Sequence, residues 1–366
     1  MKNLFAYTSF FFLLLSVFPL SYGEVVDKLT GTVWDEGSFG MKKKPYAMLL
    51  VTGFWALVLV QLLSSAPVEH YVQTVKHQAT KVDRVVTREE ELRNMIEGWR
   101  STMEIKPINA SYDESWKAAV PGYNGRSIDM EASIIQMKMT GKTTQDQLIF
   151  KEVEPDVSLE EVGVYPIYRG NPEKPAISFM INVAWGNEYL DSILKTLEAN
   201  QIKTTFFLDG SWVRRNPELA KKIASYGHEI GNHAYSHPDM KYMSDYQIRQ
   251  EIGKTQQIIE KTLGIKPNLF APPSGSFSSQ VVKIAKNDFQ MKTIMWSADT
   301  IDWMKPSPDV VIRRIDAKMG KGVMVLMHPT AATAQSLPAL IKMAKQRGLT
   351  PTTVSEVISS KRIDTP

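Results

Sequence analysis

The second half of the chain alternates between short apolar runs and stretches with helical periodicity. The apolar runs predict strands over residues 176–182, 203–208, 228–231, 268–270, 291–296 and 322–327. The stretches between them predict helices over residues 188–200, 216–226, 244–264, 278–287, 307–319 and 333–347. Apolar strands that alternate with helices indicate a buried parallel sheet covered by helices. We therefore expect an α/β domain over residues 170–360, as an open doubly wound sheet or a closed barrel, which periodicity does not distinguish.

Two continuous apolar stretches lie near the N-terminus, over residues 4–20 and 46–63. Each suits a secretory signal or a short membrane span. One interpretation is two transmembrane helices. We prefer Met41 as the true start, since Met-Lys-Lys-Lys before an apolar run is itself an export signal, which makes residues 1–40 an over-extended N-terminus.

Residues 41–66 are then a signal peptide or a membrane anchor. Small residues at 64–66 offer a cleavage site, but Pro67 directly after them disfavours signal peptidase. On either interpretation the three lysines at 42–44 stay cytoplasmic and the bulk of the chain is exported. We expect the protein on the outer face of a bacterial cytoplasmic membrane, anchored or secreted.

Residues 67–168 form a stalk and a small accessory region. A polar stretch up to about residue 104 carries a partial helical stripe of apolar residues, which indicates an amphipathic helix or a disordered linker. A turn cluster at 121–126, a short helix at 129–138 and a strand at 148–153 follow. These indicate either a small α+β module or an extended wrap against the main domain.

Composition removes several classes of function. The chain has 366 residues, enough for one large domain and accessory segments. Its 43 Lys and Arg against 39 acidic residues give a net charge of +4, too mild to indicate a nucleic-acid partner. Because cysteine is absent from the sequence, disulfides, thiolate metal sites and a cysteine nucleophile are excluded.

Polar residues suited to catalysis follow the predicted strands, at the end where parallel α/β folds place their chemistry. They are Asn182, His233, His237, Asp299, Asp302 and His328. His233 and His237 are four residues apart, and on a helical turn this spacing puts both imidazoles on one face, as metal ligands require. Such a pair alone is more often ordinary surface or core histidine. We interpret the neighbouring His228 as structural.

The string Gly227–Met240, which contains both histidines, resembles the metal-binding motif of the polysaccharide deacetylases, a carbohydrate esterase family. Three further segments resemble other motifs of that family in the right order: 203–207, 296–303 and 326–328. The resemblance covers about residues 175–358. Within the family, the chain is most similar to sporulation-associated deacetylase-like proteins of spore-forming bacilli.

The resemblance implies a distorted (β/α) barrel of about seven strands and a divalent metal, often zinc, held by Asp-His-His. A further Asp acts as general base on a metal-bound water, and a histidine acts as general acid for the leaving amine. It implies His233 and His237 as metal ligands, His328 as the acid and Leu326 as part of the acetyl pocket.

The chain departs from the family at its first and third motifs. Where two aspartates are expected it reads Phe179–Gly186, and our preferred alignment puts Asn182 at the base and Val183 at the metal ligand. An alignment on the glycine instead puts Ala184 and Trp185 there. Neither leaves a carboxylate, so a general-base contribution of about 10²–10⁴-fold is lost. The third-motif arginine is replaced by Ala271.

Two functions therefore compete. The first is an exported deacetylase of sporulation or cell-envelope metabolism that hydrolyses N-acetyl groups of a peptidoglycan- or chitin-like polymer. The alternative is an inactive membrane-anchored protein that binds such a glycan, with Trp185, Trp296 and Trp303 as stacking surfaces, although core packing is the simpler interpretation of Trp296. A third possibility is a structural role in which residues 67–168 dock to a partner. Metal binding stays open, with Asp239 or Asp299 as candidate third ligands.

The candidate site residues fall into three groups. The catalytic candidates are His328, Asp299 and Asn182. The substrate-binding candidates are Leu326, Trp303, Trp185 and Pro273. The metal candidates are His233 and His237, for a divalent ion that is expected to be zinc.

Overall fold

The computed structural model describes residues 45–363. The predictions made for the first apolar stretch, the over-extended start and the lysines at 42–44 lie outside these residues. The chain divides into two compact units, Met1–Glu90 and Glu91–Pro366, which are treated separately below. Helix α4 (Ala66–Met103) begins in the first unit and ends in the second.

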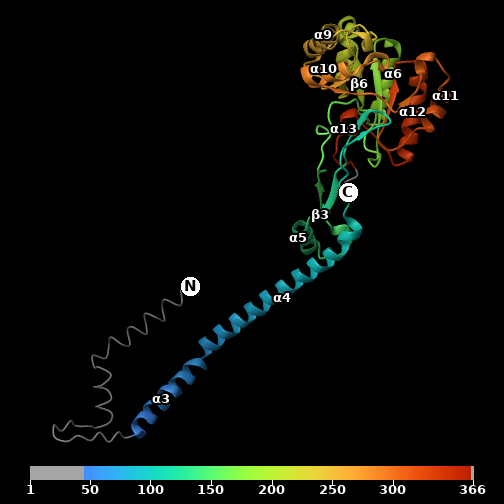
Figure 1. The fold of residues 1–366 in the computed structure, drawn as a ribbon. Coiled ribbons are helices and arrows are strands. Elements are labelled where there is room, and N and C mark those ends of the chain that lie inside the picture. Colours follow the sequence, from blue (N-terminus) through green and yellow to red (C-terminus); the bar gives the residue numbers. More distant parts are fainter. Residues whose placement is uncertain (1–44, 364–366) are drawn as a thin grey trace, which may run out of the picture. The chain divides into compact units, whose positions relative to one another are not determined.

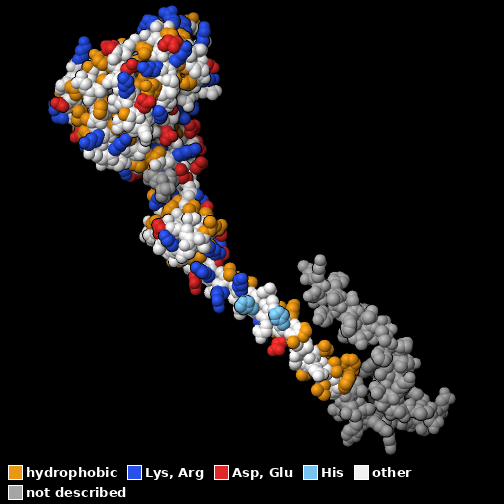
Figure 2. Space-filling view, turned by 180° about the vertical axis from the view of Figure 1, so that it is seen from behind, with side chains coloured by type: hydrophobic (Ala, Val, Ile, Leu, Met, Phe, Trp, Pro, Cys, Tyr) orange, Lys and Arg blue, Asp and Glu red, His pale blue; other side chains and the backbone are white. Residues whose placement is uncertain are grey.

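The described part of the first unit is helical. Helix α3 (Pro45–Leu63) covers the second apolar stretch, and Phe54, Trp55 and Leu57 are more than half exposed on it. Figure 2 shows the hydrophobic side chains that gather at this helix. Among the described helices, no single one is long and apolar enough to cross a membrane, whereas the bent pair Thr52–Leu63 and Ala66–Met103 passes this test together.

The second unit begins with a small module built on the end of α4. Its strands and helices are β1 (Ser111–Asp113), β2 (Ala118–Val120), β3 (Gly125–Ile128), α5 (Met130–Thr140), η1 (Gln145–Gln147) and β4 (Phe150–Val153). β1 pairs with β2 and β3 with β4, both antiparallel. Leu92 and Ile96 of α4 pack against Ile134 and Met137 of α5. Residues 105–168 are therefore an α+β module, and the predicted short helix and strand are both present.

A parallel sheet forms the centre of the second unit (Figure 1). Its strands are β5 (Ala176–Val183), β6 (Thr205–Leu208), β7 (Glu229–Asn232), β8 (Leu269–Phe270), β9 (Lys292–Thr293), β10 (Ala298–Asp299), β11 (Val323–Met327) and β12 (Thr350–Pro351). They follow the order β10-β11-β5-β6-β7-β8-β9, and β12 also pairs with β5. This curved sheet is a half-barrel, so the prediction of a distorted (β/α) barrel with about seven strands is confirmed.

Helices surround the sheet. They are α6 (Asn187–Ala199), α7 (Gly210–Arg215), α8 (Pro217–Ser225), α9 (Asp245–Leu263), α10 (Ser279–Phe289), α11 (Pro308–Asp316), α12 (Ala331–Gln346) and α13 (Val354–Ile358). Short 3-10 turns are η2 (Met240–Tyr242), η3 (Pro273–Gly275) and η4 (Asp302–Met304). Figure 1 shows α9 and α10 on one side of the sheet and α6, α11 and α12 on the other.

The alternation of side chains along β5 separates two cores. Phe179, Ile181 and Val183 pack outward against the helices, in a cluster that includes Leu190 and Leu194 of α6. Met180, by contrast, faces the concave side, in a cluster with Phe207, Leu269 and Met324 of other strands. Since successive residues of a strand point to opposite faces, this division fixes which polar residues reach the concave side.

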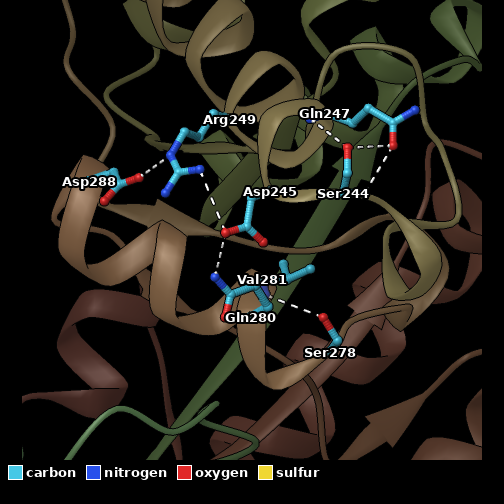
Figure 3. A network of polar contacts seen from close by, with 8 residues as sticks. All are labelled: Ser244, Asp245, Gln247, Arg249, Ser278, Gln280, Val281 and Asp288. Atoms are coloured by element: carbon cyan, nitrogen blue, oxygen red, sulfur yellow. Dashed lines mark hydrogen bonds and ion pairs between the residues drawn. The ribbon is translucent and has the colours of Figure 1, made fainter.

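Polar contacts fix the start of α9 and its contact with α10 (Figure 3). Ser244 and Gln247 form a capping box, which satisfies free N–H groups at the first turn. Arg249 pairs with Asp288 of α10 at 2.6 Å, and Gln280 of α10 donates to Asp245 at 2.8 Å. Helix α9 is therefore held at a fixed position beside the loop that carries the histidine pair.

Candidate active site

The carboxyl ends of neighbouring strands bring polar side chains to one edge of the concave face. Asn182 is two residues beyond Met180 on β5, and Asp209 is two residues beyond Phe207 of β6. Gly231 of β7 lies against the Phe207 ring, which places His233, two residues later, on the same side. Leu326 and His328 follow Met324 of β11 at the same spacing. The strand period therefore gathers the predicted residues at one rim.

The histidine pair lies in a loop, so the prediction of a helical turn is wrong. Residues 233–239 contain neither helix nor strand, and Ala234 and His237 adopt left-handed backbone angles, with φ of 59° and 56°. This loop geometry brings the two imidazole rings to 5.2 Å between centroids, edge to face. Glu251 of α9 stabilises the loop by accepting hydrogen bonds from the backbone N–H groups of Tyr235 and Ser236.

His233 is buried and held in one orientation. Its Nδ1 lies 2.8 Å from the carbonyl oxygen of Ala271, and because a carbonyl only accepts, Nδ1 carries the proton. Nε2 is then free to accept. Burial lowers the pKa of His233 to about 3, so the ring stays neutral near pH 7, the form that binds metal. His237, in contrast, is exposed.

Two buried oxygen atoms at the rim have no hydrogen-bond partner among the described residues: Oδ1 of Asn182 and Oδ2 of Asp209. Both residues are only 2% exposed. The other oxygen of Asp209 accepts from Trp212 N–H at 2.8 Å and from the Ser211 hydroxyl at 2.6 Å, so Asp209 caps α7. Burial raises the pKa of Asp209, against the opposing effect of the Ser211 and Trp212 bonds and of nearby His237.

Asp209 was missed by the analysis of the sequence. Its position immediately after a predicted strand was a usable signal, because strand ends carry the chemistry in this class of fold. Glu251 was missed as well, but it lies inside a helix and nothing in the sequence links it to the histidine loop.

His328 forms a dyad with Asp302. One carboxylate oxygen lies 2.7 Å from His328 Nδ1, and the other accepts from the backbone N–H of His328 at 2.7 Å and from the Thr333 hydroxyl. Asp302 is fully buried, whereas His328 is partly exposed. The carboxylate fixes the ring so that Nε2 is turned away from Asp302. Asp299, a catalytic candidate from the sequence, accepts through its Oδ1 from the N–H of Ile301.

The candidate substrate-binding residues have different environments. Trp185 is 44% exposed and stacks on His328, with centroids 5.7 Å apart and an interplanar angle of 10°. Trp303 is also exposed, on η4. Leu326 is buried at the end of β11, and Pro273 is buried in η3. Trp296, by contrast, packs against the concave core, as the simpler interpretation expected.

Two residues of the chain could hold a divalent metal. His233, with a free and neutral Nε2, suits zinc, and His237 lies beside it. A catalytic zinc needs a third protein ligand, however, and no cluster of three or more His, Asp or Glu residues in the described chain is arranged to hold a metal. Asp239 instead caps η2 and accepts from Ser276 and Lys241. Neither it nor Asp299 completes a site, so no catalytic step through a metal is derived.

The first motif accounts for this deficit. Val183, at the expected position of a metal-binding aspartate, is fully buried in the outer core and points away from the rim. Asn182 points to the rim but is an amide. Ala271, in place of the third-motif arginine, contributes only its carbonyl to His233.

Comparisons with known proteins agree with this description. The family model described as polysaccharide deacetylase matches residues 169–291. The uncharacterized protein YlxY of Bacillus subtilis is 50% identical over 260 residues, which cover 71% of this chain and 81% of that protein. A peptidoglycan-N-acetylglucosamine deacetylase of Bacillus cereus is 32% identical over 166 residues, 44% of this chain and 60% of that enzyme.

A solved structure is similar to most of this chain. It is a CE4 family pseudoenzyme from Bacillus anthracis, with 47% identity and a TM-score of 0.70 over 74% of this chain and 96% of that one. A mutant of that pseudoenzyme is described as having restored enzymatic activity. By its fold, its motifs and these similarities, the chain belongs to the polysaccharide deacetylases of the CE4 family.

Proposed function

We propose that the chain is a cell-envelope protein that binds N-acetylated amino-sugar polymers of the peptidoglycan type without hydrolysing them. The observation that carries this proposal is Asn182. Its side chain occupies the rim position of the family's base, and an amide cannot accept a proton near neutral pH. Similarity to a CE4 pseudoenzyme supports the same conclusion.

The parts of the site that recognise a glycan are retained. Trp185 offers an exposed aromatic ring beside His328, and aromatic rings with a few convergent polar groups are typical of ligand sites. His328, held through Nδ1 by Asp302, offers Nε2 for a hydrogen bond with a polar group of the sugar. The peptidoglycan deacetylases among the relatives support this class of ligand.

Export and anchoring belong to the same proposal. The three lysines at 42–44 precede the apolar helix α3, which supports an orientation with the remaining chain on the outer face of a bacterial cytoplasmic membrane. A role in sporulation or in general cell-envelope metabolism is part of this proposal.

Sedimentation of the full chain with purified peptidoglycan sacculi tests the binding. We expect Trp185→Ala to weaken binding about tenfold, equivalent to about 1.4 kcal/mol, because the stacking surface is removed. Trp116→Ala is the matched control, since Trp116 is 42% exposed but lies on the β1–β2 hairpin. Equal binding by both variants, or no binding by the wild-type chain, contradicts the proposal.

A deacetylase reaction is the second candidate, and one observation favours it. Asp209 lies at the end of β6, next to β5, and its buried Oδ2 has no hydrogen-bond partner among the described residues. Its carboxylate also interacts electrostatically with His237. If Asp209 replaces the missing base, the wild-type chain releases acetate from peptidoglycan and Asp209→Asn abolishes the release. Absence of acetate from the wild-type chain excludes this role.

A further inference from the structure

A regular apolar seam runs along the first part of α4, apart from the candidate site. Its residues are spaced alternately four and three positions apart in the sequence. They are Val68, Val72, Val75, Ala79, Val82 and Val86. This spacing is the heptad pattern, with 72, 79 and 86 at position a and 68, 75 and 82 at position d. Steps averaging 3.5 residues keep a seam facing a parallel neighbour in a left-handed coiled coil.

The structure confirms the helix and leaves the seam uncovered. All side chains from Glu69 to Val82 are exposed, and Val82 and Val86 reach 61% and 58%. Figure 2 shows hydrophobic side chains among polar ones along this helix. No residue of the first unit's described part packs over the seam.

The seam ends before the helix enters the second unit. The next heptad positions after Val86 are Glu89 and Arg93, which are charged. The following d position is Ile96, which is buried together with Leu92 against the chain's own small module. The stripe is therefore covered within the same chain only after the charged positions, and its part from Val72 to Val86 stays exposed.

Residues 68–87 have a low intrinsic propensity to form an isolated helix. Valine and threonine recur between Val68 and Thr87, and β-branched residues lower helix propensity. Helices in proteins are stabilised mainly by packing of an apolar face, so this segment requires a partner along its seam. We propose that residues 68–86 form a parallel coiled coil with other copies of this chain.

One contact beside the seam fits the parallel arrangement. Tyr71 at position g then lies next to Lys76 at position e of the neighbouring copy, a pairing of an aromatic ring with a cation. A second, parallel copy thus matches the seam in its apolar spacing and in this aromatic–cation contact.

The consequence for binding rests on the proposed function. A coiled coil presents two or more glycan sites from one assembly, and binding of the second site to the same polymer becomes intramolecular. Sites of modest affinity then hold the protein firmly on a repetitive glycan. The coiled coil itself does not depend on the ligand, so the two proposals fail separately.

Because the chain has no cysteine, single introduced cysteines report the contact without interference. We propose disulfide cross-linking of the full chain in bacterial membranes, with Val75→Cys and Val82→Cys at the seam. His77→Cys and Arg84→Cys, at the outward position f, are matched controls that measure random collision. The expected result is that the two seam variants form covalent dimers at least fivefold more than the controls.

A second measurement tests assembly without cross-linking. Light scattering of the full chain in detergent should show an oligomer, and Val75→Glu with Val82→Glu should reduce it to a monomer. The control, Gln73→Glu with Thr80→Glu, adds the same number of acidic side chains away from the seam and should leave the oligomer intact. A monomeric wild-type chain, or equal cross-linking at seam and control positions, overturns the proposal. Either result would indicate that lipid or another protein covers the seam.

Discussion

At the scale of single residues, the candidate site keeps the histidine expected to donate a proton but lacks the carboxylate expected to accept one. The half that donates a proton is intact, because His328 Nδ1 lies 2.7 Å from the buried carboxylate of Asp302. The half that accepts a proton is altered, because Asn182 has an amide where a carboxylate is needed. Under the proposed function, a glycan binds here, while a water that would attack it lacks a base at Asn182.

Asp302→Asn should destabilise the fold as well as the site. The carboxylate accepts from two groups of His328 and from the Thr333 hydroxyl, and an amide at this buried position leaves a donor without an acceptor. We expect a loss of about 2 kcal/mol in the free energy of unfolding. Urea denaturation measures it.

Asp299→Asn is the matched control, because Asp299 is partly exposed and accepts a hydrogen bond from the backbone N–H of Ile301. It should cost less than about 0.5 kcal/mol, as surface substitutions usually do. Equal losses for the two variants would contradict the assignment of Asp302 as the residue that orients His328.

The sequence predicted part of this residue-level description. His233, His237 and His328 were found because their motif and their places after strands both marked them. Asp302 was noticed, but its contact with His328 was not predicted, since spacing alone does not show which of two nearby carboxylates turns inward. Ala234 and His237 adopt left-handed angles that no rule for their residue types predicts.

At the scale of elements, helix α9 connects a capping motif to the site. Ser244 and Gln247 fix its first turn, and Arg249 and Asp288 fix it against α10 (Figure 3). Glu251, one turn after Gln247, holds the histidine loop. The loop is thus positioned by a rigid element, although it contains no regular structure itself. This explains how two histidines in a loop keep a fixed mutual geometry.

Gly186→Ala should be costly, because this glycine ends the β5 loop beside Trp185. Its φ is +83°, and an added Cβ would lie 1.9 Å from the carbonyl oxygen of Pro329. The loop must then move away from the rim. Gly264→Ala is the matched control, with φ of +69° and no atom within 4 Å of its added Cβ.

We expect Gly264→Ala to lower the free energy of unfolding by about 1 kcal/mol, as is usual when a residue other than glycine adopts a left-handed angle. Gly186→Ala should lower the free energy of unfolding, measured by urea denaturation, by at least twice as much. It should also weaken binding to sacculi. Similar stabilities for the two variants would show that the loop is free to relax and does not fix Trp185.

The long elements were predictable and the short ones were not. Strands such as β5 and β11, and helices such as α9 and α12, carry enough periodic residues to be recognised in the sequence. The two-residue strands β10 and β12, and the short helices α7 and α13, lack that length. They exist because neighbouring strands and core residues hold them, which a local pattern does not encode.

At the scale of the whole molecule, the described chain combines the proposed glycan site with a helix that carries an exposed apolar seam. Membrane attachment and self-association would suit a protein that holds peptidoglycan in place more than an enzyme that must move along it. The sequence predicted the barrel and its family, because several motifs occur in order. It did not predict the seam, because residues 67–104 were considered only as a stalk or linker.

The most direct test of the central claim is acetate release from peptidoglycan by the full chain and by Asn182→Asp. The account predicts that the wild-type chain binds sacculi but releases no acetate. Asn182→Asp returns a carboxylate to the rim, and any release that it gains above the wild-type background measures the contribution of the base alone, because the described chain still lacks a third metal ligand. Acetate release by the wild-type chain that is lost in His328→Ala would contradict the account.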